Sequence, residues 1–121
     1  MGLTLVDDAD IFIENDVMIG PNVTICTGAH PVSPRPRARG LQYNKPVRIC
    51  AGAWIGAGSV VLPGVTVGAG SVVGAGSVVT RDVPAGVVAV DNPCRVLREI
   101  GEKDERVYDR DRPVEGCWLD A

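Results

Sequence analysis

Residues 49–83, ICAGAWIGAGSVVLPGVTVGAGSVVGAGSVVTRDV, repeat with a period of six. The repeat is led by an aliphatic residue at every sixth position: Ile49, Ile55, Val61, Val67, Val73 and Val79. Four positions later come small or β-branched residues: Ala53, Ser59, Val65, Ser71, Ser77 and Val83. Three positions after each leading residue stand residue types that tolerate positive φ: Gly52, Gly58, Gly64, Gly70, Gly76 and Asp82. The period therefore predicts one short strand and one corner in every six residues.

The first part of the chain keeps the same phase. Its leading residues are Ile13, Ile19 and Ile25, followed four positions later by Val17, Val23 and Ala29. Its corner positions hold Asp16, Asn22 and Gly28. One such unit cannot bury its apolar face alone, but three units can close a triangular coil that stacks at about 4.8 Å on the next coil. We therefore predict an all-β fold, a single-stranded parallel β-helix over residues 1–90.

The composition agrees with a narrow core. The chain has 121 residues, enough for one domain, and 45% of them are hydrophobic while only 4% are aromatic. Five aromatic side chains cannot fill a core, whereas stacked Val and Ile suit both strands and a narrow prism. The aromatic residues are Phe12, Tyr43, Trp54, Tyr108 and Trp118.

Three segments depart from the repeat. Residues 31–46, PVSPRPRARGLQYNKP, interrupt it without changing its phase, so they predict a protruding loop, a kind of segment that often carries function. Residues 91–100 contain CRVLREI, whose apolar spacing predicts a short C-terminal cap helix that plugs the open end of the prism. Residues 101–121 read as a charged surface tail, either frayed or anchored through Tyr108 and Trp118.

Charge and cysteine usage exclude several classes of function. The formal charge of −3 gives no general attraction to nucleic acid or to anionic membranes. No stretch is apolar over the roughly 18 residues of a membrane span, and the first residues are acidic, so we expect a cytoplasmic protein. One His and four cysteines without a CxxC pair fit neither a zinc site nor a disulfide framework, and the thiols read as small buried hydrophobes.

Four segments together resemble the maltose and galactoside O-acetyltransferases of the hexapeptide-repeat superfamily, over residues 3–100. They are VDDADIFIENDVMIGPNVTICTGAHPV, GLQYNKPVRI, AWIGAGSVVLPGVTVGAGSVVGAGSVVTRDVPAGVVAV and NPCRVLREI. The resemblance implies a left-handed β-helix, a homotrimer with active sites between adjacent subunits, and acetyl transfer from acetyl-CoA to a sugar hydroxyl. The family has further N-terminal coils with an acceptor-binding Asn, so the chain looks like the C-terminal two thirds of a member.

For the acetyl acceptor, the resemblance implies a catalytic role for His30. It stands in an Ala-His-Pro sequence that matches the family's catalytic His-Pro motif. Imidazole is the side chain that most often accepts a proton from a hydroxyl at neutral pH. Asp8 matches the sugar-binding carboxylate, Asp7 shares its motif, and Tyr43 is a candidate wall of the pocket. Without the motif, the His reads as a surface residue and the acids as solvated groups on a terminal coil.

For acetyl-CoA, the resemblance implies a groove between neighbouring subunits. Trp54 matches an indole beside the acetyl and pantetheine region, although packing alone also explains it. Ala75 matches a backbone contact, and Thr80-Arg81 matches a Thr-Lys pair near the nucleotide. Arg95 and Arg98 match basic residues that face the phosphates, which Arg grips with paired hydrogen bonds. As an alternative, exposed Arg residues are simply solvated. Trp54 and Tyr43 are expected near His30.

Two other functions remain open at this point. The first is a hexapeptide acyltransferase with another acceptor, such as an amino acid or a nucleotide sugar. The second is a truncated, non-catalytic β-helix that serves only as a trimerising scaffold, because fold does not fix function. The γ-class carbonic anhydrases are excluded, since their zinc needs three His ligands and the chain has one.

Overall fold

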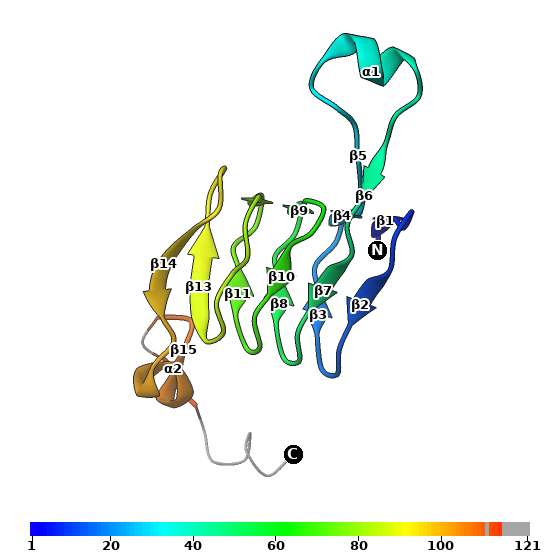
Figure 1. The fold of residues 1–121 in the computed structure, drawn as a ribbon. Helices are drawn as coiled ribbons and strands as arrows, with labels where there is room; N and C mark the ends of the chain where they lie inside the picture. Colours follow the sequence, from blue (N-terminus) through cyan, green and yellow to red (C-terminus); the bar gives the residue numbers. More distant parts are fainter. Residues whose placement is uncertain (111, 115–121) are drawn as a thin grey trace.

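The computed structural model describes residues 1–110 and 112–114, which wind into a three-sided prism (Figure 1). The first face is the sheet of β1 (Thr4–Val6), β4 (Thr24–Cys26), β9 (Val60–Val61) and β12 (Val78–Val79). The second is formed by β2 (Ile11–Ile13), β7 (Val47–Ile49) and β10 (Thr66–Val67). The third contains β3 (Met18–Ile19), β8 (Trp54–Ile55), β11 (Val72–Val73), β13 (Val87–Val90) and β14 (Arg95–Glu99). These pairs are parallel except that of β13 with β14.

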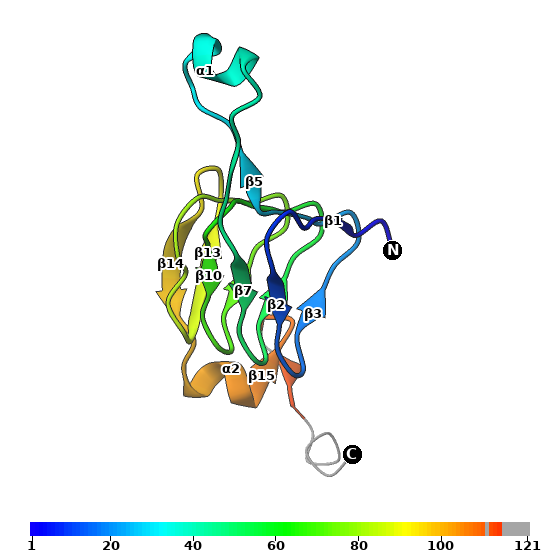
Figure 2. The same cartoon turned by 45° about the vertical axis from the view of Figure 1, so that its right-hand side comes forward.

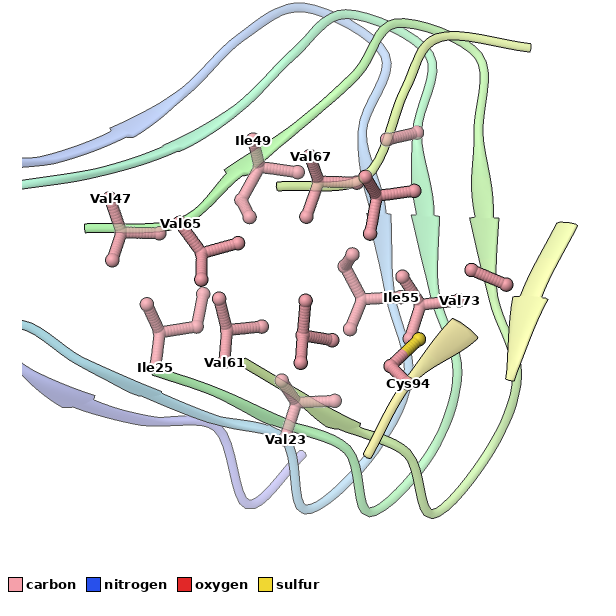
Figure 3. Packing of buried hydrophobic residues seen from close by; sticks show 14 of the residues in the cluster. Val23, Ile25, Val47, Ile49, Ile55, Val61, Val65, Val67, Val73 and Cys94 are labelled. Carbon is pink, nitrogen blue, oxygen red and sulfur yellow. The ribbon is translucent and has the colours of Figure 1, made fainter. Parts of the chain in front are cut away.

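The pairing register repeats every eighteen residues, which is three six-residue units per coil. Val61 lies beside Val79 on the first face, Ile49 beside Val67 on the second and Ile55 beside Val73 on the third. The predicted inward columns are therefore confirmed. All the leading residues from Ile49 to Val79 have no exposed surface, and their side chains meet along the axis of the prism (Figure 3).

Small serines complete the core at the corners. Ser59, Ser71 and Ser77 are fully buried, and each hydroxyl donates to a backbone carbonyl, that of Gly74 for Ser59 and Ser77 and that of Pro84 for Ser71. Each hydroxyl therefore supplies a partly buried carbonyl with a hydrogen bond that an aliphatic side chain could not make.

Most predicted corners have the backbone conformation that their residues favour. Positive φ occurs at Asp16, at Asn22 and at all five predicted corner glycines: Gly52, Gly58, Gly64, Gly70 and Gly76. Two predictions are wrong. Gly28 lies in strand β5 (Gly28–Ala29), and Asp82 has no positive φ because the last coil is two residues shorter, with Val67 bridging to Val83. There the carboxylate of Asp82 accepts from the amide of Thr66 at 2.8 Å.

The protruding loop stands on a two-stranded stem. Strand β5 pairs antiparallel with β6 (Tyr43–Asn44), and the short helix α1 (Pro34–Ala38) forms the tip. Figures 1 and 2 both show the loop projecting away from the prism. Thr24 pairs with Val60, thirty-six positions later, so the insertion adds the length of one whole coil. This explains why the repeat resumes in phase, and the stem begins ahead of Pro31.

The prediction of a cap helix over residues 91–100 is wrong, because Arg95–Glu99 form strand β14. β13 would otherwise present a row of unpaired backbone groups at the edge of the third sheet, and β14 satisfies them by antiparallel pairing. A short C-terminal helix does follow, at α2 (Glu102–Arg106), and leads into β15 (Val107–Tyr108) and β16 (Arg112–Pro113). Cys94 instead joins the core cluster at this end (Figure 3). Trp118 lies outside the described residues.

The first coil is less buried than the others. Ile13 is 42% exposed, although its phase predicts an inward side chain. The reason is that β1, β2 and β3 each form the outer strand of their sheet in the described chain, so this coil has a neighbour on one side only. Within the same residues, no helix has the length and apolar character needed to cross a membrane.

Candidate functional site

Two insertions meet at one corner of the prism. In the first coil Leu5 pairs with Ile25, twenty positions later, so this coil has two residues more than the regular eighteen. The extra residues lie in the acidic segment 7–10, between the first and second faces. The loop of residues 27–46 leaves the next coil at the same corner. We call these two segments, residues 7–10 and 27–46, the inserted corner.

Thr27 ties the two segments of the inserted corner together. Its side chain is fully buried, its hydroxyl donates to the carbonyl of Val6 at 2.8 Å, and it accepts from the amide of Ala9 at 2.9 Å. Its own amide also donates to the Val6 carbonyl, and its carbonyl accepts from the amide of Lys45. One threonine therefore fixes both the acidic segment and the base of the stem.

His30 follows β5 directly and is exposed to solvent. Its Nδ1 lies 3.2 Å from the carbonyl oxygen of Leu41, on the returning side of the loop. A carbonyl oxygen can only accept, so this contact favours the tautomer with hydrogen on Nδ1. In that tautomer Nε2 carries a lone pair and can accept a proton.

Asp8 lies against the stem beside Gly28. His30 comes two residues after Gly28, directly beyond the end of β5, and continued strand alternation predicts that the two residues face the same way. A side chain on Gly28 would clash with Asp8 Oδ2 at 2.8 Å and with Gln42 Nε2 at 2.9 Å. The Gln42 amide donates to Asp8 Oδ2 at 3.0 Å and to Asn44 Oδ1 at 2.8 Å. A carboxylate and an amide therefore share one surface of the stem, and strand alternation predicts the imidazole on the same side.

Tyr43 lies on the other side of the stem. It pairs with Ala29, and alternation places both away from the face of Gly28 and His30. The ammonium group of Lys45 lies over the Tyr43 ring, 5.7 Å from its centroid. The expected contact of Tyr43 with the face of His30 is therefore not made within one chain.

Trp54 is also separated from His30 within one chain, contrary to expectation. It stands on the third face, opposite the inserted corner, and is 50% exposed. It borders a shallow hollow of about 360 Å³ whose lining is mainly apolar. The other lining residues are Val72, Val88, Arg98, Ile100 and Asp104.

The remaining predicted CoA-binding residues are all exposed but scattered. Thr80 and Arg81 lie on the same edge as the inserted corner, further along the stack, where the last coil is short. Ala75 stands at the corner between the third and first faces, packed over Gly56, where any Cβ would come within 2.6 Å of the Ala75 amide nitrogen. Arg95 lies on β14. One chain alone therefore does not assemble these residues into a single pocket.

Arg98 is held by an acidic partner. Its guanidinium makes two parallel hydrogen bonds, of 2.9 and 2.8 Å, to the carboxylate of Asp104. This pairing and the hydrogen bond from the Gly101 amide lower the pKa of Asp104 to about 2, and the same pairing raises the pKa of Arg98. A phosphate at Arg98 has to compete with this carboxylate or bind beside it.

Sequence reasoning did not single out Thr27, Gln42 and Asn44. Ala51, Ala57 and Ala69 occupy the repeat position of Thr27 and are exposed at regular corners. The threonine in their place was a usable signal. Gln42 and Asn44 fall in the loop, where the period gives no information. Among the described residues no cluster of three or more His, Cys, Asp or Glu can hold a metal ion.

The comparisons with known proteins agree with this architecture. Residues 46–81 match the family model of the bacterial transferase hexapeptide, six repeats. The chain is 57% identical to the galactoside O-acetyltransferase of Lactococcus lactis, over 93% of this chain and 55% of that protein. It is 48% identical to the enzyme of the same name from Escherichia coli, over 93% and 56%.

Solved structures give the same answer. A galactoside acetyltransferase in complex with coenzyme A superposes with a TM-score of 0.92 at 47% identity, covering 94% of this chain and 57% of that one. A hexapeptide-repeat acetyltransferase from Vibrio cholerae, complexed with acetyl coenzyme A, superposes with a TM-score of 0.82 at 38% identity. This match covers 84% of this chain and 56% of that one.

The chain thus has the left-handed parallel β-helix fold that is found in hexapeptide-repeat transferases. More specifically, residues 46–81 carry the hexapeptide repeat of bacterial transferases, and the chain is similar to galactoside O-acetyltransferases over more than nine tenths of its length. It spans about half the length of the curated relatives it matches.

Proposed function

We propose that this chain carries the catalytic base of an acetyl-CoA-dependent O-acetyltransferase that acts on a sugar hydroxyl. The observation that carries the proposal is the contact of His30 Nδ1 with the Leu41 carbonyl at the inserted corner, which also bears Asp8 and its hydrogen bond to Gln42. The similarity to galactoside O-acetyltransferases and to a CoA-bound structure supports the choice of donor and acceptor.

In the proposed reaction, His30 Nε2 accepts the proton of the sugar hydroxyl as its oxygen attacks the thioester carbonyl of acetyl-CoA. The carbon–oxygen ester bond forms, the carbon–sulfur bond breaks, and Nε2 returns the proton to the departing thiolate. The Leu41 carbonyl holds the Nδ1–H and stabilises the imidazolium formed between the two transfers. Asp8 accepts hydrogen bonds from other hydroxyls of the sugar and so orients it.

We further propose that acetyl-CoA binds between subunits of a homotrimer. Trp54 and Arg98 line one hollow on the third face, whereas the other predicted residues, Ala75, Thr80, Arg81 and Arg95, do not line it, and an interface offers a way to bring these parts together. Sedimentation equilibrium tests the assembly: a trimeric mass supports the proposal, and a monomer that still transfers acetyl groups contradicts the shared site.

The activity is tested by following thiol release from acetyl-CoA with a panel of galactosides, glucosides, maltose, amino acids and nucleotide sugars. Acetylation of a simple sugar is the expected result. Transfer only to an amino acid or a nucleotide sugar would favour another acyltransferase of this fold. Absence of acetyl-CoA binding at millimolar concentration would favour a non-catalytic scaffold.

A further inference from the structure

The hydrogen bonds around Asp8 leave two acceptor oxygens available to a ligand. A carboxylate only accepts, so the contact with Asp8 fixes the orientation of the Gln42 amide, with Nε2 toward the acid. Both hydrogens on Nε2 are then used, one by Asp8 Oδ2 and one by Asn44 Oδ1. Among the described residues, Asp8 Oδ1 and Gln42 Oε1 receive no donor.

We propose that Asp8 Oδ1 and Gln42 Oε1 form a subsite that only accepts hydrogen bonds, and that it selects an acetyl acceptor with two adjacent donor groups. We call these two atoms the accepting subsite. Two vicinal hydroxyls on a sugar ring provide such a pair, whereas an isolated hydroxyl does not. The inference rests on the proposed function and adds to it the class of acceptor and the role of Gln42.

The placement of the accepting subsite supports this role. The clash distances at Gly28 put Asp8 and Gln42 against the stem two residues before His30, and continued strand alternation predicts His30 on the same face. A sugar held through two neighbouring hydroxyls therefore presents another part of the same ring to the imidazole. Gln42 acts as a positioning residue, because its amide holds Asp8 in place and supplies the second accepting atom.

The subsite should select a vicinal pair of hydroxyls because a ligand that lacks one of them leaves an acceptor unpaired. A ligand that lacks one hydroxyl displaces the water bound to an accepting oxygen but offers that oxygen no donor in return. Sites that bind a hydroxyl through a charged group therefore discriminate strongly against analogues that lack the hydroxyl. Since both side chains are exposed in the single chain, we expect a modest factor, about tenfold in affinity for each missing hydroxyl of the pair.

The test compares methyl galactopyranoside with its monodeoxy analogues. Binding to the full chain without acetyl-CoA is measured by NMR titration, and turnover is measured separately by thiol release. The informative variant is Gln42→Met, which keeps the length of the side chain but removes both its donor and its acceptor. Arg39→Gln, an exposed change at the tip of the same loop, is the matched control, and thermal unfolding confirms that each variant is folded.

The wild-type chain should bind at least one monodeoxy analogue about tenfold more weakly than the parent sugar. In Gln42→Met this ratio should fall below about threefold, while Arg39→Gln retains it and the KM for acetyl-CoA stays unchanged in both. Equal ratios in the wild type and Gln42→Met, or no preference in the wild type, would overturn the inference. Discrimination in binding without any thiol release would instead overturn the proposed function and leave the accepting subsite supported.

Discussion

The regular stack of residues 47–79 and the inserted corner differ in coil length, in the burial of their side chains and in the hydrogen bonds that fix them. In the stack every coil has eighteen residues, the leading side chains are fully buried, and serine hydroxyls satisfy the corners. At the inserted corner two coils exceed that length, and polar groups are fixed by hydrogen bonds to one another and to Thr27. The difference teaches that the period builds the scaffold, while its interruptions carry the candidate chemistry.

The largest expected effect separates the two regions by function. His30→Ala should lower kcat for acetyl transfer by about a hundredfold to ten-thousandfold, the usual contribution of a general base. Because His30 is exposed, its removal should leave the thermal unfolding midpoint and acetyl-CoA affinity unchanged. Thiol-release kinetics and calorimetric titration measure both. Unaltered turnover in this variant would remove the inserted corner from the catalytic site.

The second effect tests the stack through two neighbours on one strand. Ile55 is fully buried whereas Trp54 is half exposed. Ile55→Ala should reduce the free energy of unfolding by about 2–5 kcal/mol, because it removes buried methyl groups and leaves a cavity. Trp54→Ala should change it by about 0.5 kcal/mol or less if the indole serves a ligand. Urea unfolding measures both variants, and equal losses would show that Trp54 has a packing role.

The sequence predicts the regular stack better than it predicts the inserted corner and the C-terminal end. The six-residue period was sufficient for the inward columns from Ile49 to Val79, because the burial of a side chain follows its phase wherever the coil is covered by neighbours. It failed at Asp82 and at β14, where the chain leaves the period and unpaired backbone groups at the end of the stack decide the structure. His30 and Asp8 were named through family motifs, whereas the hydrogen bonds of Gln42 depend on a stem register that no pattern encodes.

A third prediction concerns the junction between the two regions. Thr27→Val keeps the shape of the buried side chain but removes one hydrogen bond from each of two partly buried groups, the Val6 carbonyl and the Ala9 amide, which should lower stability by about 1–3 kcal/mol. Thr27→Ser retains both hydrogen bonds, so its loss of stability should be smaller. The KM for the sugar should rise in Thr27→Val more than the KM for acetyl-CoA, because the acidic segment bearing Asp8 loses its anchor. A uniform fall in activity that Thr27→Ser does not rescue would assign Thr27 to packing alone.

The smallest effect lies at β14, where an ion pair on the surface links the strand to helix α2. Asp104 has a pKa of about 2, below its ordinary 3.8, because Arg98 and the Gly101 amide favour the carboxylate. A lowered pKa means that the pair stabilises the fold fully above about pH 4, and that this contribution disappears as the pH falls through about 2. The carboxyl ¹³C signal of Asp104 should therefore titrate near 2 in the wild type. Arg98→Met should move the midpoint upward toward 3.8, with the Gly101 amide retaining part of the shift, and identical midpoints would mean that Arg98 is free to bind another anion.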